Sequence, residues 1–248
     1  SEMCIRDRTK GELYDYLRER KDSTIFIHHD NLYLRNIAWG LNQISYGSED
    51  GLYINGHVTG NSPYLTFEWK AGKDGEHHEV KTQLIGEYNF ANALAAVTIG
   101  HFFDVESGKI DTALKEYTPQ NNRSQLKQTA DNTLIIDAYN ANPTSMQASI
   151  SNFHNMEIDN KMLILGDMRE LGKDGPKEHQ KIVDFLTECG FKDVMLVGEQ
   201  FAAARHDFPT YPDAPAVIEA LQKNKPHGKT ILIKGSNGIK LSTVIDYL

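Results

Sequence analysis

The sequence has no long apolar run, little cysteine and no excess of positive charge. No apolar run approaches the roughly 20 residues that a membrane-spanning helix needs, and the N-terminus carries no apolar core of a signal peptide. Lysine and arginine number 26 against 34 aspartate and glutamate, so the formal net charge is −8. Such a chain has no general electrostatic attraction for nucleic acid or anionic membranes. We therefore expect no nucleic-acid partner and no membrane insertion.

The two cysteines, Cys4 and Cys189, lie far apart in the sequence and form no C-x-x-C pair. This pattern predicts free thiols in a reducing cytosol, and hence a cytoplasmic protein. No internal repeat or low-complexity tract is present. A length of 248 residues suits one large domain or two modest ones.

The first eight residues, SEMCIRDR, match no pattern that follows them. They begin with serine rather than methionine and carry four charged side chains. We interpret residues 1–8 as a non-native or ragged N-terminal remnant.

Residues 9–158 mix short strands with amphipathic helices, and we expect them to form one domain. A helix near 10–17 precedes a strand at 24–27, and alternating pieces between 44 and 80 include a hairpin turn at Gly72-Lys73-Asp74-Gly75. The remaining expected elements are helices at 91–103 and 110–117, a strand at 134–136 and a helix that begins near Pro143.

Residues 159–248 alternate strand and helix, which predicts a second, doubly wound α/β domain. The strands at 162–165, 194–197 and 230–233 are nearly continuous apolar runs, as in parallel strands buried on both faces. Ligands of such sheets bind beyond the carboxyl ends of the strands. Those ends fall at 166–170, 198–200 and 234–238. A polar connector at 156–161 would be the hinge between the two domains.

The stretch T-L-I-I-D-A-Y-N-A-N-P-T-S-M ends a buried strand with an acid, an aromatic and two amides. A carboxylate at a strand end, Asp137, can accept the hydroxyls of a ribose. Tyr139 could stack on a base, and Asn140 and Asn142 offer hydrogen-bond donors and acceptors. Helix capping is the alternative, and for Asn142 alone, directly before Pro143, it is the better explanation.

Three further segments carry polar side chains that suit a ligand. Asn89 and Asn92 share one face at the start of an alanine-rich helix, and capping explains only the first of them. Arg123 could clamp a phosphate, although a lone arginine is more often a solvated charge. Lys234 and Ser236 stand in a glycine-containing strand-to-helix turn, where an anion could bind, but any such turn would look the same.

Taken together, these motifs resemble the Mur ligases over residues 9–248. The segments that carry the resemblance are G-E-Y-N-F-A-N-A-L-A-A, N-R-S-Q, I-I-D-A-Y-N-A-N-P-T-S-M, L-G-D-M-R-E-L-G and I-K-G-S. The resemblance implies the latter part of a central ATPase domain, followed by a Rossmann-like C-terminal domain. It also implies ATP-dependent formation of an amide bond through an acyl phosphate, with Mg²⁺ as cofactor. The implied substrates are UDP-N-acetylmuramoyl-tripeptide and D-alanyl-D-alanine, and we expect a bacterial cytoplasmic monomer.

The resemblance also implies roles for individual residues. The residues expected at ATP are Asn89, Asn92, Arg123, Asp137, Tyr139, Asn140 and Asn142. Asp167, Glu170, Lys234 and Ser236 are expected at the second substrate. Since Asp137 would serve the ligand, we expect Asp137→Ala to weaken ATP binding with little loss of fold.

Lys10 matches the lysine that Mur ligases carry as a carbamate, a catalytic group that can bind magnesium. The family's phosphate loop, G-x-x-G-K-T, is absent from the sequence, as are its metal-binding glutamate and histidine. The resemblance therefore suggests that this chain is the C-terminal part of a longer enzyme. We expect Lys10 to be unmodified in this part, and we expect the part to be inactive by itself.

Two alternatives remain open at this point. A different ligase of the same superfamily, similar to folylpolyglutamate synthase, would share the N-x-x-N motif and the strand-end aspartate but should lack G-D-M-x-E-L-G. A non-catalytic α/β binding module would explain the missing phosphate loop.

Overall fold

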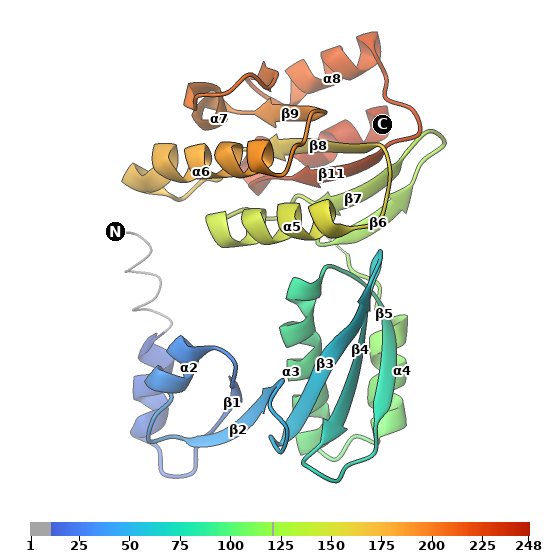
Figure 1. Cartoon of the computed structure of the whole chain (residues 1–248). Helices are drawn as coiled ribbons and strands as arrows, with labels where there is room; N and C mark the ends of the chain where they lie inside the picture. The colour runs from blue at the N-terminus through green and yellow to red at the C-terminus, as the bar shows by residue number, and fades with distance from the viewer. Residues whose placement is uncertain (1–10, 121) are drawn as a thin grey trace. The chain divides into compact units, whose positions relative to one another are not determined.

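The computed structural model describes residues 11–120 and 122–248, which divide into two compact units between Thr118 and Pro119 (Figure 1). We call residues up to 118 unit 1 and residues from 119 unit 2. The remnant at 1–8 and Lys10 lie outside the described residues, so the predictions about them stay predictions.

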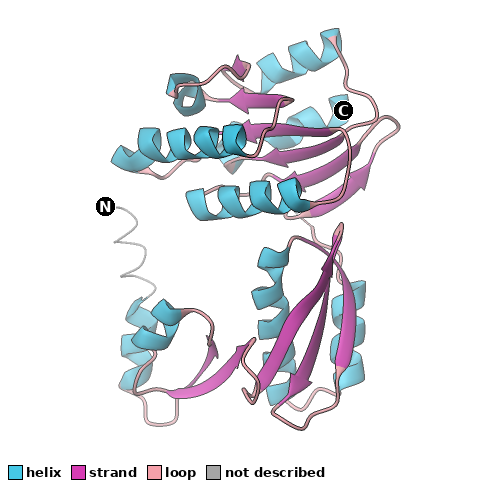
Figure 2. Cartoon of the chain, in the orientation of Figure 1, coloured by secondary structure: helices cyan, strands magenta, loops and turns pink. Residues whose placement is uncertain are grey.

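Unit 1 contains a five-stranded mixed sheet with helices packed against it (Figure 2). A helix at 11–18 comes first. The elements that follow are β1 (Thr24–His28), α2 (Leu32–Ile37), β2 (Asn42–Gly47), β3 (Ile54–Asn61), β4 (Tyr64–Ala71), β5 (His78–Ile85), η1 (Glu87–Asn89), α3 (Phe90–Phe102) and α4 (Ser107–Glu116).

The strands of unit 1 lie in the order β1-β2-β3-β4-β5. β1, β2 and β3 run parallel, whereas β4 and β5 pair antiparallel through the hairpin turn that the sequence predicts. Strand β4 alternates buried and less buried residues, which places Leu65, Phe67 and Trp69 on one face. Leu94 of α3 and Ile110 of α4 belong to the same core cluster, so both helices cover this face of the sheet.

A polar group joins α4 to the sheet inside this core. Asp111 of α4 accepts a hydrogen bond from Nε1 of Trp69 at 2.8 Å through one carboxylate oxygen. Its other oxygen lies 2.9 Å from Nδ1 of His78, whose ring stacks on Trp69 at 4.3 Å between centroids. The side chains of His78 and Asp111 are only 15% and 14% exposed. Both oxygens of a largely buried carboxylate therefore have partners, as its burial requires.

Unit 2 contains a six-stranded sheet with helices on both faces. Its elements are β6 (Gln125–Gln128), β7 (Thr133–Asp137), α5 (Pro143–Asn155), β8 (Lys161–Gly166), η2 (Gly172–Asp174), α6 (Gly175–Glu188), β9 (Val194–Val197), α7 (Glu199–Ala203), β10 (Thr210–Tyr211), α8 (Ala214–Lys223), β11 (Thr230–Lys234), η3 (Asn237–Ile239) and η4 (Leu241–Tyr247).

The strand order is β10-β9-β8-β11-β7-β6, with every pair parallel except β6 with β7. α8 and η4 share one core cluster with one face of the strands. α5 and α6 lie side by side and are absent from that cluster (Figure 1). Helices therefore cover both faces, which explains why the central strands are apolar along their whole length. The predicted doubly wound α/β architecture is confirmed.

The connections diverge between the neighbouring strands β8 and β11. After β8 the chain continues into α6, whereas after β11 it continues into η4, which packs with α8 in the other layer. Such a switch point leaves a crevice at the carboxyl ends of the strands, where ligands of open α/β sheets bind. We therefore expect a ligand site at the segments that follow β8 and β11.

The division between the units differs from the predicted domains at 9–158 and 159–248. β7 pairs with β11 along its full length, so β7 and α5 belong to the second unit rather than the first. Sheet membership depends on a partner that lies almost 100 residues later, which local pattern does not reveal. The boundary instead falls between Thr118 and Pro119.

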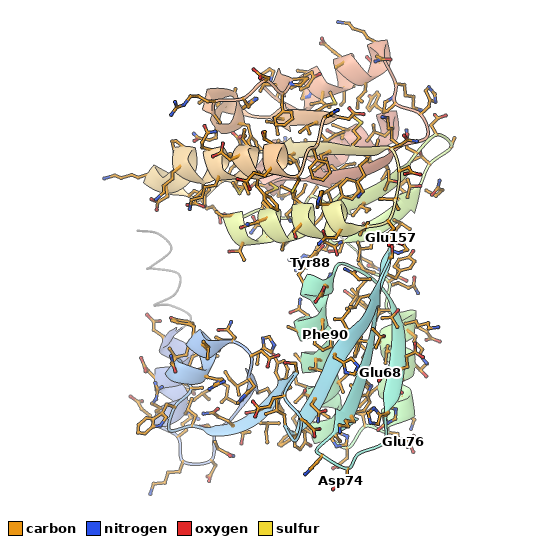
Figure 3. All side chains as sticks on the ribbon, viewed as in Figure 1. Glu68, Asp74, Glu76, Tyr88, Phe90 and Glu157 are labelled. Carbon is orange, nitrogen blue, oxygen red and sulfur yellow. The ribbon has the colours of Figure 1, made fainter. Side chains whose placement is uncertain are left out.

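The predicted hinge at 156–161 is wrong for the same reason. This segment, in which Figure 3 labels Glu157, joins α5 to β8 inside unit 2. Nζ of Lys161 donates to the carbonyl oxygens of His154 and Met156 at 2.7 and 2.8 Å. The end of the helix is therefore tied directly to the next strand.

Cys189 is a free thiol, as predicted, and Cys4 lies outside the described residues. Burial, and then the negative charge of Glu188, raise the pKa of the Cys189 thiol, so it carries less thiolate than an ordinary cysteine. Within residues 11–120 and 122–248, no helix has the length and apolar character to cross a membrane.

We predict that Asp111→Ala lowers the free energy of unfolding of unit 1 by about 1–3 kcal/mol, because it leaves two buried groups without an acceptor. The sequence has two tryptophans. Since Trp39 is 82% exposed and Trp69 is 1% exposed, Trp39→Phe leaves a buried reporter of this unit. Urea unfolding followed by Trp69 fluorescence measures the effect, with the exposed Glu116→Ala as control. Equal stability of the two variants would contradict the role of Asp111.

Candidate functional site

A pocket of about 410 Å³ opens beyond the carboxyl ends of β8 and β9 in unit 2. We call it the strand-end pocket. Its lining residues come from three turns: Asp167, Met168, Arg169, Glu170, Leu171, Gly172 and Gly175 after β8, Gly198, Glu199, Gln200 and Pro212 around β9 and β10, and Ile239 after β11. The pocket lies where the topology of the sheet predicts a ligand site.

Asp167 joins two of these turns. Its carboxylate oxygens accept the backbone N–H groups of Gln200 and Phe201, both at 2.9 Å, at the first turn of α7. Gly198 has a φ of +118°, and a Cβ there would lie 2.3 Å from this carboxylate. Only glycine fits both the backbone conformation and the space. The side chain of Asp167, predicted to face the substrate, therefore holds the wall of the pocket.

His179 of α6 holds the turn after β8 through two hydrogen bonds. Its side chain is fully buried; Nε2 accepts the N–H of Met168 at 3.0 Å, and Nδ1 donates to the carbonyl oxygen of Gly175 at 2.7 Å. Glu170, two residues after Met168, has a φ of +71°. A non-glycine residue in this conformation costs free energy and is retained where surrounding contacts impose it.

The carboxyl ends of β7 and β11 meet in a buried ion pair. Nζ of Lys234 lies 2.5 Å from Oδ2 of Asp137, and the two side chains are 1% and 14% exposed. Ser149 of α5 also donates to this oxygen at 3.1 Å, and the carbonyl oxygen of Asn140 lies 3.5 Å from the ammonium. The predicted strand-end acid and the predicted lysine are therefore brought together, and one oxygen of Asp137 is already occupied.

Ser236 connects the turn after β7 to the turn after β8. Its hydroxyl oxygen accepts the N–H of Arg169 at 2.8 Å and lies 3.5 Å from the carbonyl oxygen of Ala141. Lys234 and Ser236 were predicted as an anion site. The structure instead shows the side chains of both engaged in contacts between turns of unit 2.

Arg123 and Tyr139 form a stacked pair on the surface of unit 2. The guanidinium carbon lies 3.7 Å from the centroid of the tyrosine ring, which is 46% exposed. A cation at this distance is attracted by the face of the ring. Two residues predicted to contact the nucleotide therefore touch each other and form a flat, positively charged surface.

The two asparagines that follow Tyr139 differ in their surroundings. Asn142 caps α5: its Oδ1 accepts the N–H of Ser145 at 2.9 Å, and the hydroxyl of Ser145 accepts the N–H of Asn142. The capping explanation preferred for Asn142 alone is confirmed. Asn140 is exposed, and its Oδ1 accepts the N–H of the next residue at 2.8 Å.

In unit 1, Asn89 and Asn92 stand at the beginning of α3, where Figure 3 labels their neighbours Tyr88 and Phe90. Asn89 does not cap the helix with its side chain; Nδ2 donates to the carbonyl oxygen of Ile85 at 2.8 Å. Asn92 is exposed within the helix. Neither side chain performs the capping that would explain an asparagine here.

Metal binding finds no support in the described part of the chain. Residues 11–120 and 122–248 contain no group of three or more His, Cys, Asp or Glu that could hold a metal ion. Lys10, the predicted magnesium ligand, lies outside this range.

Sequence reasoning missed several residues of the site. Arg169 and Glu199 line the pocket, and His179 and Ser149 hold its neighbours in place. Both lie in the strand ends at 166–170 and 198–200, where the sequence predicts that ligands bind, but the sequence did not single them out within those segments. His179 and Ser149 sit in mid-helix, where nothing local distinguishes them from surface polar residues.

Comparison with known proteins identifies the class of unit 2. Residues 122–237 match the family model described as "Mur ligase, glutamate ligase domain". The whole chain is 27% identical to UDP-N-acetylmuramoyl-tripeptide–D-alanyl-D-alanine ligase of Synechocystis, over 54% of that protein. The same enzyme of Bacillus subtilis is 28% identical over 75% of this chain and 44% of its own length.

Solved structures share the fold. MurF of Acinetobacter baumannii superposes with a TM-score of 0.79 at 23% identity, over 96% of this chain and 54% of that one. MurF of Thermotoga maritima, solved in complex with ADP, superposes with a TM-score of 0.75 at 17% identity, over 92% and 53% of the two chains.

Residues 122–237 are therefore a Mur ligase C-terminal domain, and the resemblance noted in the sequence is confirmed. The relatives that match most of the chain are named UDP-N-acetylmuramoyl-tripeptide–D-alanyl-D-alanine ligase. The chain spans about half the length of these curated relatives.

The buried ion pair argues against the expectation that Asp137→Ala causes little loss of fold. We predict that this variant lowers the stability of unit 2 by about 3–5 kcal/mol, because it leaves the buried ammonium of Lys234 uncompensated. The double variant Asp137→Ala/Lys234→Met should recover part of the loss, since no unpaired charge remains. Urea unfolding with amide hydrogen exchange of β11 reports both.

Asp193→Ala is the matched control, because it removes the carboxylate of the more exposed pair with Lys229. It should cost at most about 1 kcal/mol. The interpretation fails if Asp137→Ala is no more destabilising than this control.

Proposed function

We propose that this chain is part of an ATP-dependent ligase that adds D-alanyl-D-alanine to UDP-N-acetylmuramoyl-tripeptide. The observation that supports this proposal is the arrangement of residues at the carboxyl edge of the unit 2 sheet. There the D-A-Y-N-A-N-P, G-D-M-R-E-L-G and K-G-S segments converge through Lys234–Asp137 and Ser236. The names of the relatives that match the chain support the substrates.

For the nucleotide, we propose the surface formed by Arg123 and Tyr139 in unit 2. Considering unit 1 by itself, we propose the amides of Asn89 and Asn92 as further nucleotide-binding groups. An exposed aromatic ring suits a purine base, and a guanidinium suits phosphate oxygens. Neither asparagine caps α3 with its side chain. The ADP in the Thermotoga MurF structure supports nucleotide binding by this fold.

Asp137 would contribute in a second way. Oδ2 is taken by Lys234 and Ser149, while Oδ1 can still accept a ribose hydroxyl. Asn140 lies next to it on the same turn, with its amide exposed. Asn142 caps α5, so its contribution to ATP is to fix that turn.

In the proposed reaction, a carboxylate oxygen at the end of the tripeptide attacks the γ-phosphorus of ATP, the bond to the β-phosphate oxygen breaks, ADP leaves, and an acyl phosphate forms. The amine of D-alanyl-D-alanine attacks the acyl carbon, phosphate leaves, and an amide bond remains. Mg²⁺, when bound, would neutralise charge on the phosphates. The residues of this chain would bind and orient the nucleotide and the dipeptide, which is a large part of the catalysis of a two-substrate reaction.

Asp167, Glu170, Lys234 and Ser236 would serve the dipeptide side of the site. Glu170 lines the strand-end pocket directly, whereas Asp167, Lys234 and Ser236 shape it through the contacts described above. We further propose that the enzyme acts as a monomer in the bacterial cytoplasm. The supply of ATP and of nucleotide-linked precursors there supports that location.

The test uses the protein expressed from the complete reading frame that encodes this sequence. We predict ATP-dependent formation of the UDP-linked pentapeptide from the two substrates, detected by mass spectrometry together with phosphate release. Tyr139→Leu should raise the KM for ATP about tenfold, as expected when a base loses a stacking partner worth ~1–3 kcal/mol. Tyr139→Phe, which keeps the ring, should stay near wild type.

Two results would contradict the proposal. Absence of the pentapeptide with all substrates present would exclude this ligase activity. An unchanged KM in Tyr139→Leu would remove the tyrosine from the nucleotide site.

A further inference from the structure

The carboxylate of Asp137, at the end of β7, has partners on one of its two oxygens. Nζ of Lys234 lies 2.5 Å from Oδ2, and the hydroxyl of Ser149 donates to the same oxygen at 3.1 Å. Within residues 11–120 and 122–248, nothing donates a hydrogen bond to Oδ1. A carboxylate has about two acceptor sites on each oxygen. Oδ2 is therefore filled by the protein, and Oδ1 is left for another donor.

Two other largely buried carboxylates use both of their oxygens. The side chain of Asp111 is 14% exposed, the same as that of Asp137. One of its oxygens accepts from Trp69, and the other lies 2.9 Å from His78. Asp167 accepts one backbone N–H group on each oxygen. These carboxylates hold the fold and are fully paired, because burial penalises an open acceptor. The open oxygen of Asp137 thus indicates a role beyond holding the fold.

The hydroxyl of Ser149 also departs from the usual pattern. Inside a helix, a serine or threonine hydroxyl commonly donates to the carbonyl oxygen four residues earlier. Thr98, Thr112 and Thr187 do so in this protein, at 2.7, 2.7 and 3.1 Å. Ser149, which is 4% exposed in α5, donates instead to Asp137 on β7. Its hydroxyl therefore serves the end of the strand rather than its own helix.

The position of this hydroxyl is fixed by α5. The helix begins at Pro143 and is capped by reciprocal hydrogen bonds between Asn142 and Ser145. Ile150, the residue after Ser149, is fully buried, so the middle of the helix is anchored in the core. A group that orients another residue must itself be held by its surroundings, and Ser149 meets this requirement.

We propose that Ser149 is a positioning residue for recognition of ribose. Together with Lys234 it occupies Oδ2 and holds the carboxylate of Asp137 in the orientation that presents Oδ1 to a ribose hydroxyl. The inference rests on the proposed function for the choice of a ribonucleotide. It adds that the ribose is recognised through one oxygen of Asp137. Ser149 acts through Asp137 rather than on the nucleotide, and it sets the preference for ribose over deoxyribose.

Nucleotides that lack one ribose hydroxyl provide the test. ATP, 2′-deoxyATP and 3′-deoxyATP are titrated by calorimetry into the full-length protein, expressed from the complete reading frame. Wild type should bind ATP about tenfold more tightly than the weaker of the two deoxynucleotides, as expected for one hydrogen bond to a charged group. In Ser149→Ala the affinity for ATP should fall and that for this deoxynucleotide should not, which reduces the preference to about threefold or less.

Matched variants separate a changed preference from a loss of fold. Ser151→Ala is the control, because Ser151 lies on the same helix and makes no side-chain hydrogen bond in the part of the chain that the structure describes. It should keep the tenfold preference. Ser149→Cys keeps the size of the side chain but donates weakly, so it should lose most of the preference as well. Cooperative urea unfolding of each variant reports the fold.

A Ser149 that only stabilises the fold predicts a different result. The variants would then unfold at lower urea, but their affinities for ATP and for the deoxynucleotides would change by the same factor. A tenfold preference that persists in Ser149→Ala or Ser149→Cys therefore overturns the inference. So does a wild type that binds ATP and both deoxynucleotides equally.

The outcomes for Ser149 and for the ligase activity are distinguishable. Ligation by a Ser149→Ala variant that still prefers ATP tenfold overturns the inference while the proposed function stands. A preference for ribose that depends on Ser149, without any ligation by wild type, keeps the inference and rejects the proposed function.

Discussion

A buried ammonium group at the end of β11 constrains the whole carboxyl edge of the unit 2 sheet. Lys234 is 1% exposed, so its charge requires a partner, and β7 supplies Asp137 from the neighbouring strand. Two residues further on, Ser236 contacts the turns after β7 and β8. The positions of three separate turns therefore depend on β11 lying between β7 and β8, with its lysine neutralised.

The polar side chains along this edge have two roles, which depend on whether their hydrogen bonds are already made within the protein. Asp167, His179, Ser236 and Asn142 have their hydrogen-bonding groups committed to neighbouring backbone, and they shape the turns. Arg169, Glu170 and Glu199 are exposed at the strand-end pocket, and none of them forms an ion pair within residues 11–120 and 122–248. Buried polar groups thus hold the turns, and exposed groups only a few residues away can contact a substrate. Preorganised sites require such support of the contacting residues by their neighbours.

Much of unit 2 could be predicted from the sequence because its strands are apolar on both faces and its helices are amphipathic. The Asp137 turn was also predictable as a site, since a strand that ends in polar residues is unusual. The domain boundary was not, because β7 joins the second sheet through β11, far along the chain. The partner of Asp137 was equally hidden: nothing local shows that Lys234 is buried rather than solvated.

The most direct measurement is a crystal structure of the protein with D-alanyl-D-alanine at saturating concentration. We predict that the dipeptide lies in the strand-end pocket, in contact with Glu170. Lys234 should remain paired with Asp137. A dipeptide bound elsewhere, with the pocket empty, would contradict the account.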